Sequence, residues 1–276
     1  MSPARRPGQL DLFAAPSAAG GRSVQPAPVA ETLRQTAERM PATIRLGTSS
    51  WSFPGWAGIV YDTEVAQARL ARNGLAAYAQ HPLLRTVGVD RSYYGPLSAD
   101  VFAAYAHAVP EDFRFLVKAH ELCTIDRFPE HPRYGAQQGA RNALFLDASY
   151  AADTVVAPFV EGLGPRAGPL LFQFPPHDVA ALGGRDRFAE RLHGFLRALP
   201  HGPLYAVEIR NTELLTPAYV DALVDADVSH CVSAHPRLPP VATQARIAQR
   251  ALSAATVIRW MLPRGVGYEA ARERYR

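Results

Sequence analysis

From Ile44 onward, short apolar runs alternate with longer segments whose apolar residues recur at helical spacing. A strand followed by a helix and then by another strand is the repeating unit of a parallel sheet, so this alternation predicts an α/β chain. The expected strands are Ile44–Ser50, Thr86–Tyr93, Arg114–His120, Leu170–Pro175, Leu204–Arg210, His230–His235 and Thr256–Leu262. The expected helices are Ala66–Gln80, Ala99–Ala108, Ser149–Gly162, Arg185–Ala198, Pro217–Asp225 and Val241–Ser253.

The order of these elements favours a TIM-like (β/α)8 barrel over an open, doubly wound sheet. No glycine-rich G-x-G-x-x-G turn follows the first expected strand, which weakens the dinucleotide-binding alternative. The sequence ends at Arg276, inside the helix expected after the strand Thr256–Leu262. A barrel that lacks its last strand and helix would have an open edge. We therefore expect the chain to be a C-terminally incomplete fragment.

The composition changes sharply before the first expected strand. Residues 1–43 are rich in Ala, Pro, Gly, Ser and Gln and show little periodicity. We expect a disordered N-terminal arm there, with a short helix around Glu31–Arg39, followed by one barrel domain over residues 44–276. The whole chain is 48% hydrophobic and 20% charged, which is ordinary for a globular protein with one large core.

Charge, cysteine content and hydropathy argue against several classes of protein. The formal net charge of +4 is too small to indicate a nucleic-acid-binding protein by itself. The two cysteines, Cys123 and Cys231, lie far apart and lack the spacing of a metal site or a disulfide framework. No apolar run is long enough to span a bilayer, and the N-terminus lacks a signal-peptide stretch. We expect a cytoplasmic protein with no membrane partner.

One basic residue differs from all the others. The chain has 29 lysine and arginine residues, and Lys118 is the only lysine among them. An ammonium is a compact donor whose pKa shifts on burial, whereas a guanidinium stays charged and planar. Two interpretations are open: a chance lysine in a composition biased towards arginine, or a site that needs an ammonium.

Polar side chains gather where the expected strands end, and this is the end of a (β/α)8 barrel that carries active sites. The candidate catalytic residues are Lys118, Glu208 and Asp90, because such charges are costly to bury unless they pair or meet a ligand. Strand alternation predicts that Lys118 and His120 share one face. An ion-pair network such as Lys118–Glu208, which only sets the register of the barrel, is the structural alternative. The candidate substrate-binding residues are Trp51, Tyr94, His120, Gln173, Arg210, His235 and Arg259.

Several segments resemble motifs of the family known as domain-of-unknown-function 72, or YecE-like. They are Ile44–Trp56, Val87–Tyr94, Phe113–Ala119, Gly168–Pro176 and Tyr205–Arg210, in the order and spacing of the family. The resemblance covers about residues 44–276 and implies a TIM-like barrel, but no settled reaction. The chain departs from the family pattern at three positions and lacks the usual last strand with its Asn-Asn pair. The departures are Asp90 where the family usually has Glu, Arg91 where it has Asn, and Ser50 where it has Gly.

The N-terminal arm contains a short motif of its own. Gln9, Leu10, Asp11, Leu12 and Phe13 resemble the pentapeptide that binds the bacterial DNA polymerase sliding clamp. Two buried apolar side chains would each contribute roughly 1.5–3 kcal/mol, which is enough for micromolar affinity after ordering costs. The candidate clamp-binding residues are Gln9, Leu10, Leu12 and Phe13. The alternative is an arm that happens to contain these apolar residues.

The leading hypothesis is a hydrolase or nuclease-like enzyme for an anionic, phosphate-containing or nucleic-acid substrate, recruited by the clamp. Lys118, Arg210 and Arg259 would contact the anion, and Asp90 or Glu208 would serve as general acid or base. A non-catalytic barrel that binds a ligand or a protein is the first alternative. A sugar-directed glycosidase or isomerase is the second. Its aromatic platform would consist of Trp51, Trp56, Tyr93 and Tyr94.

No cofactor is identified from the sequence. A divalent metal would need ligands such as His120, Glu208, His235 and Asp90, but the chain has no two-histidine ligand motif, so no metal ligand is assigned. Lys118 as a Schiff-base nucleophile is a further alternative.

Overall fold

Helices and parallel strands alternate in the computed structural model, which describes residues 23–252, 255–262, 266, 270 and 273. The chain divides into two units. The first contains Met1–Gly88 and Ala103–Arg114, and the second contains Val89–Phe102 and Phe115–Arg276. Residues 44–276, expected as one barrel domain, are thus distributed over both units. None of the described helices has the length and apolar character needed to cross a membrane.

The first unit pairs the strands β1 (Leu46–Thr48) and β2 (Leu84–Val89, in this unit up to Gly88) in parallel. The helices α2 (Gln67–Asn73) and α3 (Leu75–Tyr78) connect them. Gly47 is required where the strands meet, because a Cβ atom there would lie 2.0 Å from the carbonyl oxygen of Thr86. A strand, a helical crossover and a parallel strand form the βα unit that the sequence predicts.

Residues 23–43 differ from the disordered arm expected for them. They include α1 (Glu31–Arg39), which has the predicted bounds. The backbone N–H of Ala27 donates to the carbonyl oxygen of Val60 at 3.0 Å, and the side chains of Val24 and Ala27 are buried. Backbone pairing and apolar burial therefore order this segment, although its composition is that of a polar linker.

The second unit contains four parallel strands that pair in chain order: β3 with β4, β4 with β5, and β5 with β6. Their bounds are Arg114–Lys118 for β3 (in this unit from Phe115), Ala167–Gln173 for β4, Tyr205–Glu208 for β5 and Ser229–His230 for β6. A further parallel pair joins β7 (Val232–Ala234) to β8 (Ile258–Trp260). The expected strand His230–His235 is therefore split at Cys231, with β6 paired to β5 and β7 paired to β8.

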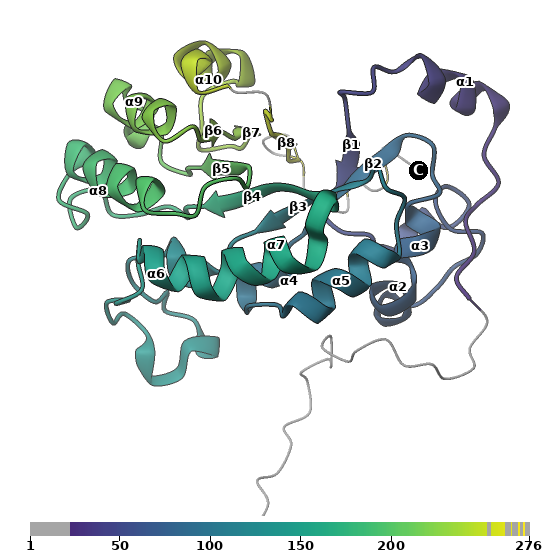
Figure 1. Cartoon of the computed structure of the whole chain (residues 1–276), viewed down its shortest axis with the longest axis horizontal. Coiled ribbons are helices and arrows are strands. Elements are labelled where there is room, and N and C mark those ends of the chain that lie inside the picture. Colours follow the sequence, from purple (N-terminus) through teal and green to yellow (C-terminus); the bar gives the residue numbers. More distant parts are fainter. Residues whose placement is uncertain (1–22, 253–254, 263–265, 267–269, 271–272, 274–276) are drawn as a thin grey trace, which may run out of the picture. The chain divides into compact units, whose positions relative to one another are not determined.

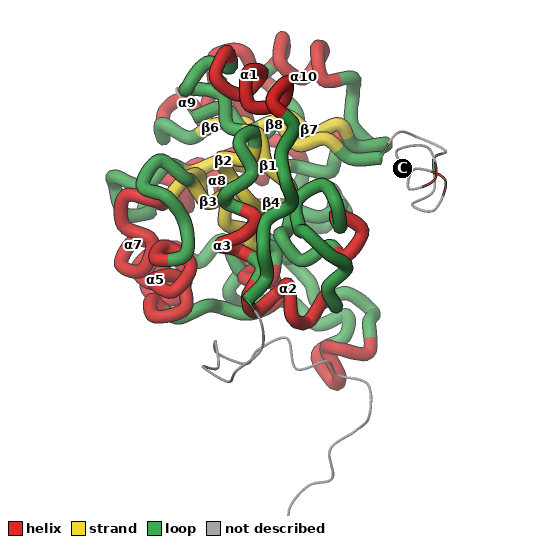
Figure 2. Tube along the Cα trace, turned by 90° about the vertical axis from the view of Figure 1, so that its right-hand side faces the viewer, coloured by secondary structure: helices red, strands yellow, loops and turns green. Residues whose placement is uncertain are grey.

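Helices follow these strands, and most of them lie in the predicted positions. Helix α4 (Arg91–Tyr94) is an exception, because it occupies the last part of the expected strand Thr86–Tyr93. The helices of this part of the chain are α4 (Arg91–Tyr94), α5 (Ala99–His107, across the unit boundary), α6 (Ala148–Tyr150), α7 (Ala157–Leu163), α8 (Arg185–Arg197), α9 (Pro217–Asp225) and α10 (Val241–Ile247). Figure 1 shows α8, α9 and α10 following one another along one side of strands β4 to β7. In Figure 2, the red helix α9 lies beside the yellow strand β6 of this unit.

Pairing between consecutive strands through helical crossovers is the progression of a (β/α) barrel, whereas a doubly wound sheet reverses its order near the middle. The predicted α/β, TIM-like fold class is confirmed. The predicted absence of a last strand concerns the sequence after Leu262, most of which lies outside the described residues.

The outer face of the strands packs on the apolar side of the helices. On α8 this side carries Phe188, Leu192 and Phe195, which recur at helical spacing and are all buried. The ring of Phe195 meets that of Phe172 on β4 edge to face, with their centroids 5.2 Å apart. Packing of this kind holds the strands, and the strands in turn position the side chains of their other face.

Candidate active site

In the second unit, an apolar layer of side chains is followed by a polar layer towards the carboxyl ends of the strands. The apolar cluster takes one side chain from each successive strand or its flank: Leu116, Leu171, Ala206, Cys231 and Val257. Because side chains alternate along a strand, the residue two positions later shares the same face. Two positions after each of these five apolar residues stands a polar one, and we call this second set the polar layer: Lys118, Gln173, Glu208, Ser233 and Arg259. The candidate site therefore lies at the carboxyl ends of the strands, where the residues on this face change from apolar to polar.

Glu208 lies in the middle of this layer and is fully buried. One carboxylate oxygen contacts Nη2 of Arg210 at 2.6 Å, and the other accepts a hydrogen bond from Nη1 of Arg259. The same Arg259 nitrogen donates to the amide oxygen of Gln173 at 2.8 Å. Burial lowers the pKa of Arg210, while for Arg259 the effect of burial is outweighed by Glu208, which raises its pKa. Glu208 thus forms an ion pair with two guanidiniums, one at each oxygen, and hydrogen-bonds that of Arg259; its Oε1 makes no hydrogen bond among the described residues.

Lys118 pairs with Asp90 rather than with Glu208, which corrects the ion pair suggested by the sequence. Its Nζ lies 3.1 Å from Oδ2 of Asp90, and the two side chains are 12% and 38% exposed. Burial lowers the pKa of Lys118, and this effect exceeds the opposing effect of Asp90. Lys118 is therefore a stronger acid than an ordinary lysine, and its carboxylate partner reaches solvent.

The charges of the layer act on one another. Arg259 and Glu208 both influence the pKa of Lys118, and Asp90 influences that of Arg259. When Arg210 and Asp90, which contact the layer, are included, three cations meet two carboxylates, so the cluster carries an excess of positive charge. An excess of buried donors and positive charge favours an anionic ligand.

The two histidine candidates make contacts of their own. Strand β3 ends at Lys118, so its alternation does not extend to His120. The His120 ring instead lines a small cavity with Val117, and its Nδ1 lies 2.5 Å from the hydroxyl oxygen of Tyr150. Burial lowers the pKa of His120 to about 4, so the ring is neutral at pH 7. The Nδ1 of His235 accepts the backbone N–H of Arg237 at 3.2 Å.

The metal alternative lacks a grouped ligand set. Within the part of the chain that the structure describes, no three His, Cys, Asp or Glu residues are grouped so as to hold a metal ion. The set that the sequence suggested, His120, Glu208, His235 and Asp90, is therefore not assembled.

The two aromatic candidates have different surroundings. Trp51 belongs to the first unit, where its indole N–H donates to the carbonyl oxygen of Ala71 at 3.3 Å. Its ring is buried and lies edge to face with Tyr105. Tyr94 belongs to the second unit and is 63% exposed. The clamp-binding candidates Gln9, Leu10, Leu12 and Phe13 lie outside the described residues.

Two features of this unit received no role from the sequence. Ser233 is fully buried, and the side chain of Gln244 holds both its backbone N–H and its carbonyl. Its hydroxyl has no hydrogen-bond partner among the described residues. Ser233 lies within the expected strand His230–His235, but the sequence does not show that it is buried. The second feature is the contact of His177 Nδ1 with Asp126 Oδ1 at 2.8 Å, which ties the loops after β3 and β4 together and has no sequence signal.

Comparison with known proteins identifies one family. A sequence model described as "Protein of unknown function DUF72" matches residues 45–276. A solved DUF72 structure from Thermotoga maritima is 21% identical with a TM-score of 0.52, over 81% of this chain and 78% of that chain. An Enterococcus faecalis DUF72 structure is 18% identical with a TM-score of 0.44, over 82% and 92%. A second crystal structure of that protein matches at 22% identity and a TM-score of 0.45, over 71% of this chain and 62% of that chain.

The search of curated proteins returned no match. The likeness to the Thermotoga maritima structure supports the fold and carries no information on chemistry.

Proposed function

This chain belongs to the DUF72 family, and we propose that its polar layer is the active site of a hydrolase for an anionic, phosphate-containing substrate. One observation carries the proposal: the largely buried ammonium of Lys118 and the solvent-reaching carboxylate of Asp90 form an acid–base pair at 3.1 Å. This pair lies in an electrostatic environment shared with Arg259 and Glu208. Acid, base and anion contacts are the groups that phosphoester hydrolysis needs.

Anion binding rests on Lys118 and the two arginines. The guanidiniums of Arg210 and Arg259 are already fixed by Glu208, so little side-chain freedom remains to be lost when an anion arrives. Under this proposal Glu208 is a positioning residue that acts through its arginines. Both of its oxygens contact a guanidinium, although Oε1 makes no hydrogen bond among the described residues. Glu208 is fully buried, whereas Asp90 reaches solvent, and we therefore assign proton transfer to Asp90.

The reaction would proceed by attack of water on phosphorus. Asp90 accepts a proton from the water as the new P–O bond forms, and the ammonium of Lys118 donates a proton to the leaving oxygen as the old P–O bond breaks. The products are an alcohol and a phosphate with one ester bond fewer. The proton on Asp90 then returns to the Lys118 amine across their direct contact, which restores both groups. Arginine could not replace this lysine, because a guanidinium does not release its proton in this pH range.

Asp90→Asn tests the assignment of the base. We expect hydrolysis of p-nitrophenyl phosphate or bis(p-nitrophenyl) phosphate to fall roughly 100-fold or more, because the amide cannot accept the proton. Binding of inorganic phosphate should be retained or become tighter, because a negative charge has left the site. Turnover measured by absorbance and affinity measured by calorimetry give the two readouts. Asp221→Asn is the matched control, since Asp221 forms an exposed ion pair with Arg250.

The same measurements separate the alternatives. A wild-type protein that binds phosphate but turns over neither ester would be a binding module instead of an enzyme. A wild-type protein that binds no phosphate would contradict the proposal altogether. Equal turnover by wild type and Asp90→Asn would remove Asp90 from the mechanism.

Recruitment by the bacterial sliding clamp is a second proposal, supported by the segment Gln9–Phe13. The motif offers a glutamine for a pocket rim and two apolar side chains for a groove. We expect the full chain to bind purified clamp with micromolar affinity, and a Leu12→Ala, Phe13→Ala double variant to lose that binding in a pull-down. A variant that binds clamp as well as wild type would refute the proposal, and turnover at the polar layer serves as the folding control.

A further inference from the structure

We propose that Tyr94, Arg133 and Tyr134 form a stacking subsite for the base of a nucleotide whose phosphate occupies the polar layer. The inference rests on the proposed function and narrows its substrate class from a phosphate ester to a nucleotide unit. We call these three residues the stacking subsite.

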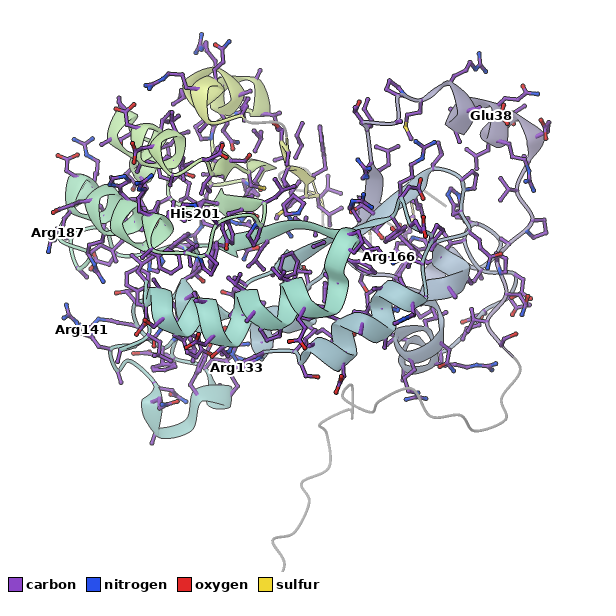
Figure 3. The ribbon with its side chains drawn as sticks, in the orientation of Figure 1. Glu38, Arg133, Arg141, Arg166, Arg187 and His201 are labelled. Carbon is purple, nitrogen blue, oxygen red and sulfur yellow. The ribbon has the colours of Figure 1, made fainter. Side chains whose placement is uncertain are left out.

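The guanidinium of Arg133 lies at the centre of the stacking subsite. Arg133 belongs to the 3-10 helix Pro132–Gln137 in the loop after β3, and Figure 3 labels it. Its Cζ lies 5.0 Å from the ring centroid of Tyr94 and 4.4 Å from that of Tyr134. Glu121 is buried and pairs with Arg133, and its Oε2 also accepts the Tyr134 hydroxyl at 2.9 Å. The guanidinium is therefore held by a carboxylate and two aromatic rings.

Part of the stacking subsite is exposed to solvent. Tyr94 is 63% exposed, and the side chain of Arg133 is 36% exposed. Aromatic rings and guanidinium planes are the surfaces on which proteins stack unpaired bases. Glu121 neutralises the charge of Arg133, so the stack favours a flat, uncharged ring over a second anion.

The stacking subsite adjoins the polar layer through Tyr93. The ring of Tyr93 meets that of Tyr94 edge to face, with centroids 5.3 Å apart, and lies 5.7 Å from Nζ of Lys118. Glu121 and Arg133 both influence the pKa of Tyr93, which burial raises. One tyrosine therefore contacts the anion-binding ammonium and the exposed ring. A ligand with a phosphate at one end and a planar ring at the other matches this arrangement.

The experiment compares three ligands that share a phosphate: inorganic phosphate, ribose 5-phosphate and adenosine 5′-monophosphate. Calorimetric affinities are measured for wild type, Tyr94→Leu and Tyr94→Phe, with circular dichroism to confirm folding. For wild type we expect adenosine monophosphate to bind roughly tenfold more tightly than ribose 5-phosphate, because stacking one base contributes about that much. Tyr94→Leu should remove this difference without weakening inorganic phosphate, and Tyr94→Phe should keep it.

Each of the other possible outcomes would contradict one part of the proposal. Equal wild-type affinities for ribose 5-phosphate and adenosine monophosphate would refute the stacking subsite and leave the hydrolase proposal standing. Retention of the tenfold difference in Tyr94→Leu would place the base elsewhere and refute the role of Tyr94. Failure of wild type to bind any of the three ligands would contradict the proposed function and, with it, this inference.

Discussion

Replacing Lys118 with arginine should lower kcat for phosphoester hydrolysis by roughly 100- to 10,000-fold, the usual contribution of a positioned general acid. The substitution retains the positive charge and a partner for Asp90, so KM should change little. What it removes is the transferable proton, because a guanidinium keeps its proton at pH values at which a lysine ammonium loses it. Steady-state kinetics that separate kcat from KM make the measurement.

The pH profile gives a second readout for the same residue. Burial lowers the pKa of Lys118, so the ammonium loses its proton at a lower pH than an ordinary lysine, whose pKa is about 10.4. Wild-type activity should therefore fall as pH rises through this lowered pKa. Arg250→Met, which removes an exposed cation, is the control and should leave kcat and its pH profile unchanged. If the Lys118→Arg variant had the wild-type kcat, Lys118 would not be the general acid and would serve only as an anion contact.

The second large effect concerns stability. Glu208→Ala should lower the free energy of unfolding by about 3–5 kcal/mol, because it leaves two guanidiniums without the carboxylate that compensates their burial. Arg210 and Arg259 have side chains only 9% and 14% exposed, so water cannot replace Glu208 fully. Urea unfolding should show a lower midpoint at an unchanged slope.

A surface ion pair supplies the comparison. Asp221→Ala breaks the contact with Arg250, where the side chains are 59% and 68% exposed. Such pairs contribute about 0–1 kcal/mol, so its midpoint should stay near that of wild type. If Glu208→Ala were no more destabilising than Asp221→Ala, the two buried arginines would not depend on Glu208.

Local signals were sufficient for several elements. Helix α9 has the predicted bounds because Thr216 caps it, accepting the backbone N–H of Tyr219, and because Pro217 suits its first position. Helix α1 also has its predicted bounds. Such signals act within a few residues, so they can be read without knowing what surrounds the segment.

Other predictions were wrong where contacts with a segment far away in the sequence determine the local structure. The expected strand His230–His235 is divided at Cys231, because its two halves pair with different neighbours. Residues 23–43 resemble a linker in composition, yet Val24 and Ala27 are buried. His120 leaves the face of Lys118 because the strand ends before it, and strand ends depend on neighbouring strands.

For the site, alternation along each strand determined which side chains share a face, and it brought Lys118, Gln173, Glu208 and Arg259 to one layer. Sequence by itself thus determined the fold class, the element order and the chemical character of that layer. The tertiary structure alone decided the partners: Lys118 with Asp90, and Glu208 with Arg210 and Arg259. The reason is that charges pair over a few ångströms, and those distances depend on the register between strands and on the packing of the loops that follow them.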